Sequence, residues 1–299
     1  MFKLDEVKVL HLEPTNKCNA VCPQCPRTIY LDKLVESELT LADIKSMLPI
    51  EFIRQLNKMF MCGNFGEPAA AKDALEIFKW FREVNPTIEL GMNTNGGLRS
   101  RTWWSQLAKL TNYVVFSIDG LEDTNHIYRI NVSWSKLIEN VNAFIAAGGN
   151  AQWDMLVYEH NEHQILQATE LAKAMGFKCF RSKVTRRKMN IDFLRLPKTM
   201  TFTPITSGSI KCHALQEQSI YLSAEGELLP CCFIGTTKFD SVPVTLSNSN
   251  LRTNNVSNIV PRFTRVTDTW EKDPLKICSD TCSTSTSNFN NQWKTEVNF

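Results

Sequence analysis

Three cysteines near the amino terminus, Cys18, Cys22 and Cys25, have side chains and a spacing that suit metal chemistry. They follow the pattern C-x3-C-x2-C within the run Glu13-Pro-Thr-Asn-Lys-Cys-Asn-Ala-Val-Cys-Pro-Gln-Cys-Pro. A structural zinc or a closed [4Fe–4S] cluster normally takes four protein ligands. A cluster held by only three thiolates leaves one iron without a protein ligand, and that iron can chelate a small molecule. The spacing therefore predicts an iron–sulfur cluster with an open iron.

The position of these cysteines favours the cluster over two simpler interpretations. The alternatives are a zinc knuckle completed by a distant residue such as His11, and a group of buried thiols with no ligand. The apolar segment Val7 to Leu12 precedes the cysteines, and a polar loop and an expected helix from about Thr40 follow them. This order of strand, loop and helix is typical of the first unit of a β/α barrel.

Length and composition narrow the class of protein further. The chain has 299 residues, of which 43% are hydrophobic, enough for a large domain and a smaller module. With 33 basic and 31 acidic residues the net charge is +2, so we expect neither nucleic acid nor a membrane as partner. Met1 to Glu13 carry both signs of charge, and no stretch reaches the ~18 apolar residues that span a bilayer. We therefore expect a cytoplasmic protein whose ten cysteines serve metal binding rather than disulfides.

Short β-rich segments alternate with helical patterns up to about residue 184, which predicts βαβ units and a parallel sheet. The fold class expected is α/β, a partial (β/α)6 TIM-like barrel with a small C-terminal α+β iron–sulfur module. In such sheets ligands gather at the carboxyl ends of the strands. The expected strands are Val7–Glu13, Lys58–Cys62, Thr87–Asn93, Tyr113–Ile118, Ala151–Tyr158 and Lys178–Lys183, and the expected helices are Leu41–Met47, Lys72–Val84, Thr102–Leu110, Trp134–Ala147 and Asn161–Met175.

The cysteine motif resembles that of the radical S-adenosylmethionine (SAM) superfamily, and three strand-end motifs strengthen the resemblance. Cys62-Gly-Asn-Phe-Gly-Glu-Pro is similar to the superfamily's GGE motif, with Gly66 and Glu67 at the matching positions. The resemblance implies that this backbone holds the amino group of SAM, since glycine lets a ligand approach the main chain. Asn93-Thr-Asn-Gly-Gly, which contains Thr94 and Asn95, is similar to the TNG element.

After the fourth expected strand, Phe116-Ser-Ile-Asp-Gly resembles the SxDG element of the same superfamily. The resemblance implies that Ser117 and Asp119 face the ribose or the methionine carboxylate of SAM. Arg129 matches an arginine that pairs with the SAM carboxylate in related enzymes, a task that suits a planar guanidinium. Each of these motifs has an ordinary turn or surface role as its alternative. Gln24 departs from the pattern, because many relatives have an aromatic residue there that packs near the adenine.

A second group of cysteines near the C-terminus resembles the auxiliary-cluster extension called SPASM, or its shorter form, twitch. Cys212, Cys231, Cys278 and Cys282 would hold one closed [4Fe–4S] cluster, which has no vacant site and suits electron transfer. Cys232 competes with Cys231, although adjacent residues of a strand point to opposite faces. A structural zinc on the same four thiolates is the alternative. The resemblance predicts a barrel over residues 1–185, a linker over 186–211, the module over 212–283 and a poorly ordered tail over 284–299.

Two further signals lie in the middle of the chain. His160 and His163 stand beside carboxylates, but their spacing is not that of a zinc protease, and Asn161 is expected to cap a helix instead. The basic run from Arg181 to Lys188 follows the sixth expected strand; it is either a solvated linker or a site for an anionic substrate or a peptide carboxylate. Position alone makes Asp154, Glu159 and Asp192 candidates for a general base.

The resemblance implies an enzyme that cleaves SAM reductively to a 5′-deoxyadenosyl radical and abstracts hydrogen from a substrate. With an auxiliary cluster as electron acceptor the net reaction would be a two-electron oxidation. Its implied cofactors are SAM and two [4Fe–4S] clusters, and its implied partners are a substrate peptide or small polar metabolite and a one-electron reductant such as flavodoxin or ferredoxin. The alternative from another class is a non-enzymatic scaffold or electron-transfer protein that binds iron–sulfur clusters or zinc.

Overall fold

Six parallel strands form the centre of the fold, in the order in which they occur along the chain. They are β1 (Val9–Leu12), β2 (Lys58–Met61), β3 (Glu89–Thr94), β4 (Tyr113–Ser117), β5 (Ala151–Val157) and β6 (Cys179–Val184). The computed structural model describes residues 3–185, 191–199, 209–239, 246–268, 270–283 and 293–299. Each predicted strand is confirmed, with ends that differ by no more than two residues.

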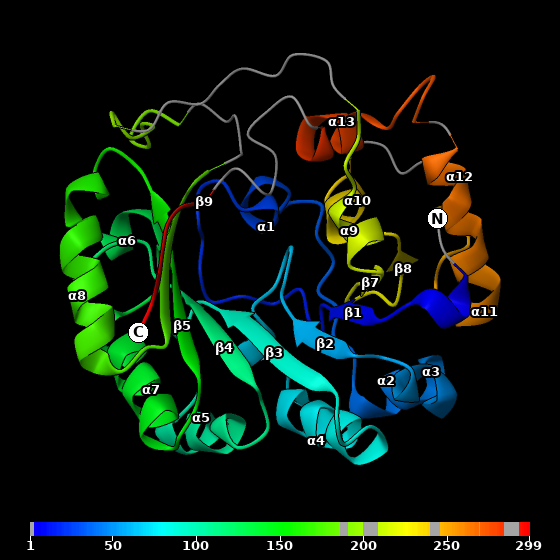
Figure 1. Cartoon of the computed structure of the whole chain (residues 1–299), viewed down its shortest axis with the longest axis horizontal. Coiled ribbons are helices and arrows are strands. Elements are labelled where there is room, and N and C mark those ends of the chain that lie inside the picture. The colour runs from blue at the N-terminus through cyan, green and yellow to red at the C-terminus, as the bar shows by residue number, and fades with distance from the viewer. Residues whose placement is uncertain (1–2, 186–190, 200–208, 240–245, 269, 284–292) are drawn as a thin grey trace.

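Helices cover the convex, outer face of the curved sheet (Figure 1). They are α2 (Leu41–Met47), α3 (Ile50–Arg54), α4 (Ala74–Val84), α5 (Arg101–Ala108), α7 (Trp134–Ala146) and α8 (Ile165–Met175). Their ends follow local chemistry: the Thr40 side chain accepts from the Asp43 N–H to start α2, and Gly176, with φ of 91°, ends α8. Asn161 lies at the predicted N-cap position, before the 3-10 turn Glu162–Gln164 that leads into α8, but its side chain does not cap that turn. Its amide instead donates to the carbonyl oxygens of Asp119 and Leu156 and closes the loop after β5.

The two faces of the sheet differ in chemistry, as the period of two along a strand requires. On the outer face Trp153 and Phe180 are fully buried, with ring centroids 5.7 Å apart, and pack beneath the helices. Their neighbours Asp154 and Arg181 point to the inner, concave face, where they form an ion pair. The inner face therefore carries the polar side chains that a substrate would meet.

Both edges of the six-stranded core are covered by strands from the C-terminal third of the chain. On one side β7 (Ser219–Leu222) pairs parallel with β1, and β8 (Leu228–Leu229) follows antiparallel; on the other β9 (Trp293–Asn298) pairs antiparallel with β6. The result is an open nine-stranded sheet, not a closed barrel. β7 and β8 form a hairpin that extends the central sheet beyond β1. The prediction of a poorly ordered tail was wrong for residues 293–299, because an unpaired β6 edge offers hydrogen bonds that the tail satisfies.

The remaining helices are short and lie outside the main helical layer. They are α1 (Pro26–Ile29), α6 (Asn125–Tyr128), α9 (His213–Gln216), α10 (Cys232–Gly235), α11 (Val256–Ile259), α12 (Thr264–Thr267) and α13 (Lys276–Cys282). The basic run divides at the end of β6: Arg181 and Lys183 lie within the strand rather than after it, and residues 186–188 lie outside the described residues. Within the described part of the chain, every helix is too short or too polar to cross a membrane.

Candidate functional site

Cys18, Cys22 and Cys25 lie on the loop that leads from β1 to α1, and Cys25 is the N-cap residue of α1. The Cys25 N–H donates to the Cys22 carbonyl oxygen at 3.0 Å, which turns the loop back on itself. Burial raises the pKa of Cys18 to about 12, and negative charge on Glu67, Cys22 and Cys25 contributes. The three side chains thus lie close enough to interact. Because a metal binds the thiolate, loading this site releases protons.

The arrangement of the three cysteines bears on the kind of metal site that they could form. Among the described residues, no three His, Cys, Asp or Glu side chains are arranged to hold one ion, and this includes the three cysteines. A cubane cluster binds each cysteine to a different iron and so spreads its ligands more widely. His11, proposed above as a fourth zinc ligand, is engaged elsewhere: its Nε2 lies 2.6 Å from the Cys62 carbonyl oxygen, and its ring stacks on Phe60 at 4.5 Å.

Arg129 connects the end of β4 to the loop over residues 13–25, which carries the three cysteines and is called the cluster loop below. Its Nε donates to Asp119 Oδ2 at 2.6 Å, and its Nη1 lies 3.8 Å from Cys22 Sγ. Asp119 is fully buried, and its other oxygen accepts from the Leu156 N–H at 2.6 Å. The structure therefore brings Asp119 and Arg129 together at the cysteines. It also gives Asp119 two protein partners, while Ser117 lies half-buried on the inner face of β4.

The Glu67 carboxylate joins the loop after β2 to the end of β3. It is buried and accepts from the Thr94 hydroxyl at 2.6 Å and from the Asn95 N–H at 2.7 Å. The Asn95 side-chain amide in turn lies 3.8 Å from Cys18 Sγ. The GGE-like and TNG-like segments, predicted separately from the sequence, thus meet at the first cysteine. Their roles toward SAM remain predictions.

Gly66 occupies a position where the backbone leaves no room for a side chain. A Cβ there would lie 1.8 Å from the Thr15 carbonyl oxygen, and this backbone oxygen cannot move aside like the end of a flexible side chain. Replacement would therefore push the GGE-like loop away from the loop that carries the cysteines.

We expect Gly66→Ala to lower the free energy of unfolding by about 2 kcal/mol and to raise the Kd for SAM at least about tenfold. Gly148→Ala is the matched control, since Gly148 has φ of 87° but no atom within 4 Å of an added Cβ. That control should lose about 1 kcal/mol of stability through backbone strain and keep its SAM affinity. Chemical unfolding and SAM titration of the reconstituted protein measure both effects. Equal SAM affinity in the two variants would contradict the assignment.

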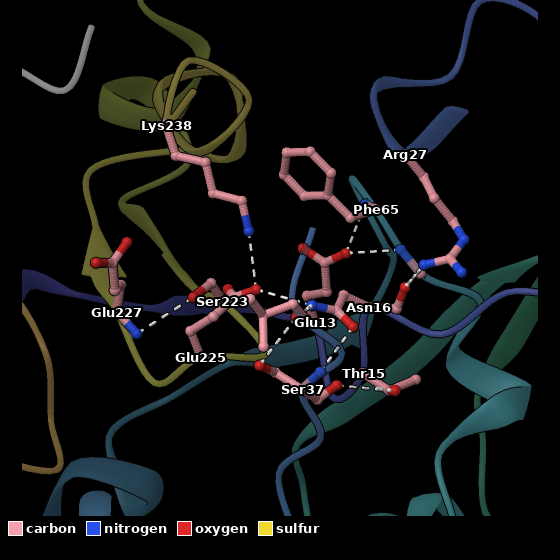
Figure 2. Close-up of polar contacts among 12 residues, drawn as sticks. Glu13, Thr15, Asn16, Arg27, Ser37, Phe65, Ser223, Glu225, Glu227 and Lys238 are labelled. Atoms are coloured by element: carbon pink, nitrogen blue, oxygen red, sulfur yellow. Dashed lines mark hydrogen bonds and ion pairs between the residues drawn. The ribbon is translucent and has the colours of Figure 1, made fainter. Parts of the chain in front are cut away.

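Glu13, for which the sequence predicted no role, binds the backbone of the GGE-like loop after β2. Its Oε1 accepts from the Phe65 N–H at 2.6 Å and the Gly66 N–H at 2.9 Å, and its Oε2 accepts from the Tyr221 hydroxyl of β7. Figure 2 shows Glu13 between Phe65 and the contacts of the β7–β8 hairpin. The only signal in the sequence was a carboxylate at the end of a largely apolar strand.

The neighbouring Asn16 ties the start of the cluster loop to that hairpin. Its side-chain amide donates to Glu225 Oε1 at 2.9 Å, and Glu225 pairs with Lys238 at 2.8 Å (Figure 2). Arg27, just after the last cysteine, donates to the Asn16 carbonyl oxygen. The cluster loop is therefore held at its base by residues from the C-terminal third of the chain.

Burial raises the pKa of Glu13 from 4.5 to about 7, against the lowering effect of its three hydrogen-bond donors. The folded protein therefore retains this proton over a pH range in which the unfolded chain releases it. We expect Glu13 to make a contribution to the free energy of unfolding of the metal-free protein, and this contribution should fall by about 3 kcal/mol as the pH rises from about 4.5 to 7. The variant Glu13→Gln should lose this pH-dependent contribution, whereas Glu122→Gln, at an exposed site, should keep it. Urea unfolding at pH 5 and 7.5 measures the difference, and parallel pH profiles for wild type and Glu13→Gln would refute it.

Gln24, the position where relatives carry an aromatic residue, has a structural role of its own. It is buried, and its Oε1 accepts from the Tyr158 hydroxyl at 2.8 Å and from the Thr185 hydroxyl at 2.9 Å. These partners directly follow β5 and β6. Gln24 therefore fixes the cluster loop, which follows β1, to the strands at the opposite edge of the six-stranded core. A phenylalanine or tryptophan could accept neither bond.

The C-terminal cysteines converge on a second site. Cys212, Cys231, Cys278 and Cys282 all line one cavity, whose other walls include Ile210, Phe233, Val266 and Ile277. Cys278 and Cys282 stand one helical turn apart on α13. Burial raises the pKa of Cys278 to about 12, and negative charge on Cys282 and Cys212 adds to it. Cys232 does not line this cavity. Negative charge on it raises the pKa of both Cys231 and Cys62, in each case after the larger effect of burial.

The general-base candidates differ in environment. Asp154 is buried and paired with two basic residues, whereas Glu159 pairs with the exposed Lys198 at 2.6 Å. Asp192 is exposed. His160 is half-buried and stacks on Tyr158 at 5.6 Å, and none of the described contacts joins it to His163 in a metal site.

Comparisons with known proteins match this geometry. The Radical SAM superfamily model matches residues 12–172. The fold is similar to anSMEcpe with bound AdoMet and Cp18Cys peptide (TM-score 0.63, 13% identity, covering 96% of this chain and 92% of that one). It is also similar to Streptococcus suis SuiB bound to S-adenosylmethionine (TM-score 0.57, 16% identity, covering 92% and 67%) and to BtrN in an open conformation (TM-score 0.52, 13% identity, covering 95% and 96%).

The matched region extends from β1 into α8 and contains the three cysteines and all three strand-end motifs. It covers more than half of the chain, and the resemblance drawn from the motifs is thereby confirmed. Members of this family are SAM-dependent iron–sulfur enzymes, which argues against a non-enzymatic scaffold. The chain belongs to the radical SAM superfamily and is an enzyme.

Proposed function

We propose that Cys18, Cys22 and Cys25 hold a [4Fe–4S] cluster whose fourth iron binds SAM. When bound and reduced, the cluster supplies the electron that splits SAM into methionine and a 5′-deoxyadenosyl radical, which abstracts hydrogen from the substrate. One observation carries the proposal: the ends of β2, β3 and β4 meet the cysteine loop through Glu67, Asn95 and Arg129. A zinc knuckle or a group of structural thiols would need no such convergence.

The protein's own groups position the reactants in this proposal. Gly66 lets the backbone after β2 approach the amino group of SAM, and Glu13 and Glu67 hold that backbone from two sides. Arg129 places a buried positive charge beside Cys22. It stabilises negative charge on the thiolates and on a bound carboxylate. Ser117, on the inner face of β4, is the remaining candidate for a contact with the ribose.

We also propose that Cys212, Cys231, Cys278 and Cys282 hold an auxiliary [4Fe–4S] cluster in a twitch-like module. Support comes from the single cavity that all four sulfurs line and from its largely apolar walls, which exclude water. A cluster with four protein ligands would suit electron transfer, and held by these cysteines it would serve as the acceptor for the second electron of the substrate's oxidation. The net reaction is then a two-electron oxidation.

The proposed substrate is a peptide or a small polar metabolite, and the proposed reductant is a flavodoxin or ferredoxin. One similar structure, anSMEcpe, contains a Cp18Cys peptide, which favours the peptide.

The proposal is tested by anaerobic reconstitution, reduction with dithionite and quantitation of 5′-deoxyadenosine. We expect SAM-dependent product from wild-type protein without added substrate, and about eight irons per chain for two clusters. Zinc in the C-terminal site would give about four irons and one zinc. Reconstituted, reduced protein that forms no 5′-deoxyadenosine would refute the first proposal.

A further inference from the structure

Two basic side chains of β6, Arg181 and Lys183, lie on the inner face of the sheet. Arg181 and Lys183 alternate along β6 with fully buried Phe180 and Ser182, which face the helices. Thr185, two residues beyond Lys183, hydrogen-bonds to Gln24 beside the third cluster cysteine. The basic pair therefore lies on the wall of the space into which a SAM-derived radical would be released.

Asp154 holds both basic groups in place. Its Oδ1 accepts from Nε and Nη2 of Arg181 at 2.8 Å, and its Oδ2 lies 3.2 Å from Lys183 Nζ. Asp154 is buried, whereas the two basic side chains each keep 23% of their surface exposed. The single carboxylate of Asp154 is thus paired with two cations. Nη1 of Arg181 hydrogen-bonds to none of the described residues.

The ring of Trp293 in β9 packs against both Arg181 and Lys183. Arg181 Cζ and Lys183 Nζ both lie 4.6 Å from the centroid of its ring. Cation–π contacts of this kind fix the direction of a guanidinium and an ammonium. Glu296 lies opposite Arg181 in the β6–β9 register, but it is exposed and forms no ion pair with either cation in the described contacts.

The register of the sheet places this group next to the predicted SAM site. Ser117, Asp154 and Arg181 are direct neighbours across β4, β5 and β6 and therefore share one face. The positive charge of Lys183 also lowers the pKa of Cys62, at the end of β2, against the larger raising effect of burial. The charge of Lys183 thus acts across the inner space, between the GGE-like loop and β9.

We propose that Arg181 and Lys183, whose directions are fixed by Asp154 and by the Trp293 ring, bind an anionic group of the substrate, a carboxylate or a phosphate. The proposal rests on the proposed function, which brings the substrate to this face. A guanidinium already turned by Asp154 offers its remaining N–H groups to two oxygens, and the ammonium adds a second donor. Asp154 both positions the cations and competes with the incoming anion.

The test uses reconstituted protein with SAM bound and three probes: hippurate, phenyl phosphate and the uncharged hippuramide. Calorimetric titration should show that at least one anion binds at least tenfold more tightly than hippuramide, and the two anions distinguish carboxylate from phosphate. Arg181→Gln should weaken binding of that anion at least tenfold. Asp154→Asn should strengthen it severalfold, because it removes the competing charge. Arg195→Gln, at an exposed arginine, is the control and should leave it unchanged.

A purely structural ion pair predicts a different pattern. In that case Asp154→Asn would weaken binding as much as Arg181→Gln does, or the anions would bind no better than hippuramide, and either result would overturn the inference. Because Arg181→Gln leaves a buried carboxylate short of a partner, the double variant Asp154→Asn/Arg181→Gln provides a second measurement. It should fold and lose the anion selectivity, and retained selectivity would count against the proposal. Formation of 5′-deoxyadenosine in the same samples tests the proposed function separately.

Discussion

A variant with alanine at Cys18, Cys22 and Cys25 is expected to form no detectable 5′-deoxyadenosine and to retain about four of about eight irons. The reason is that all protein ligands of the SAM-binding cluster are lost together, while the C-terminal cysteines are untouched. Cys179→Ala is the matched control, since Cys179 is a buried thiol remote from both cysteine groups. It should keep the iron content and the SAM cleavage of wild type.

The same variant separates the cluster from a merely structural role of the loop. The loop is also held by Asn16, Arg27 and Glu13, and none of these contacts uses a cysteine side chain. The triple variant should therefore fold with a circular dichroism spectrum like that of wild type. SAM cleavage at the wild-type rate in this variant would remove the basis of the proposed function.

The second large effect is expected at two adjacent residues, Cys231 and Cys232. Cys231→Ser should lower the iron content from about eight to about four per chain, because it removes a ligand from the cavity shared with Cys212, Cys278 and Cys282. Cys232→Ser should keep about eight irons, because Cys232 does not line that cavity. Both variants should still cleave SAM in the absence of substrate.

The comparison of these neighbours controls for local stability, since both residues lie at the start of α10 and both substitutions are equally small. Iron analysis and Mössbauer spectroscopy of the two proteins give the measurement. Loss of iron from Cys232→Ser with a full complement in Cys231→Ser would reverse the ligand assignment. Equal iron in both would argue against an auxiliary cluster at this cavity.

The order of the six central strands was predictable because each βα unit is local in sequence and its hydrophobic pattern identifies it. The two edge pairings were not. β7 joins β1 across more than two hundred residues, and the alternating segment at 293–298 follows a Ser/Thr/Asn-rich stretch that carries no pairing signal. Such contacts depend on which edge remains unpaired, and only the assembled sheet determines that.

The same distinction between features local in sequence and contacts between distant segments applies to the candidate site. The three candidate cysteine ligands could be identified because their spacing lies within one short segment, and the strand-end motifs because each follows a predicted strand. Glu13 could not be found, since its partners Phe65, Gly66 and Tyr221 come from distant segments. The pairing of Arg181 and Lys183 on Asp154 likewise depends on the register between β5 and β6, which a basic run in the sequence does not reveal.

Electron paramagnetic resonance of the reduced, reconstituted protein, recorded with and without SAM, tests the central claim most directly. The account predicts a [4Fe–4S] signal that changes when SAM is added, with hyperfine coupling to 15N or 17O in labelled SAM, and the loss of that component in the triple-alanine variant. A cluster signal that SAM leaves unchanged in wild-type protein would contradict an open iron at Cys18, Cys22 and Cys25.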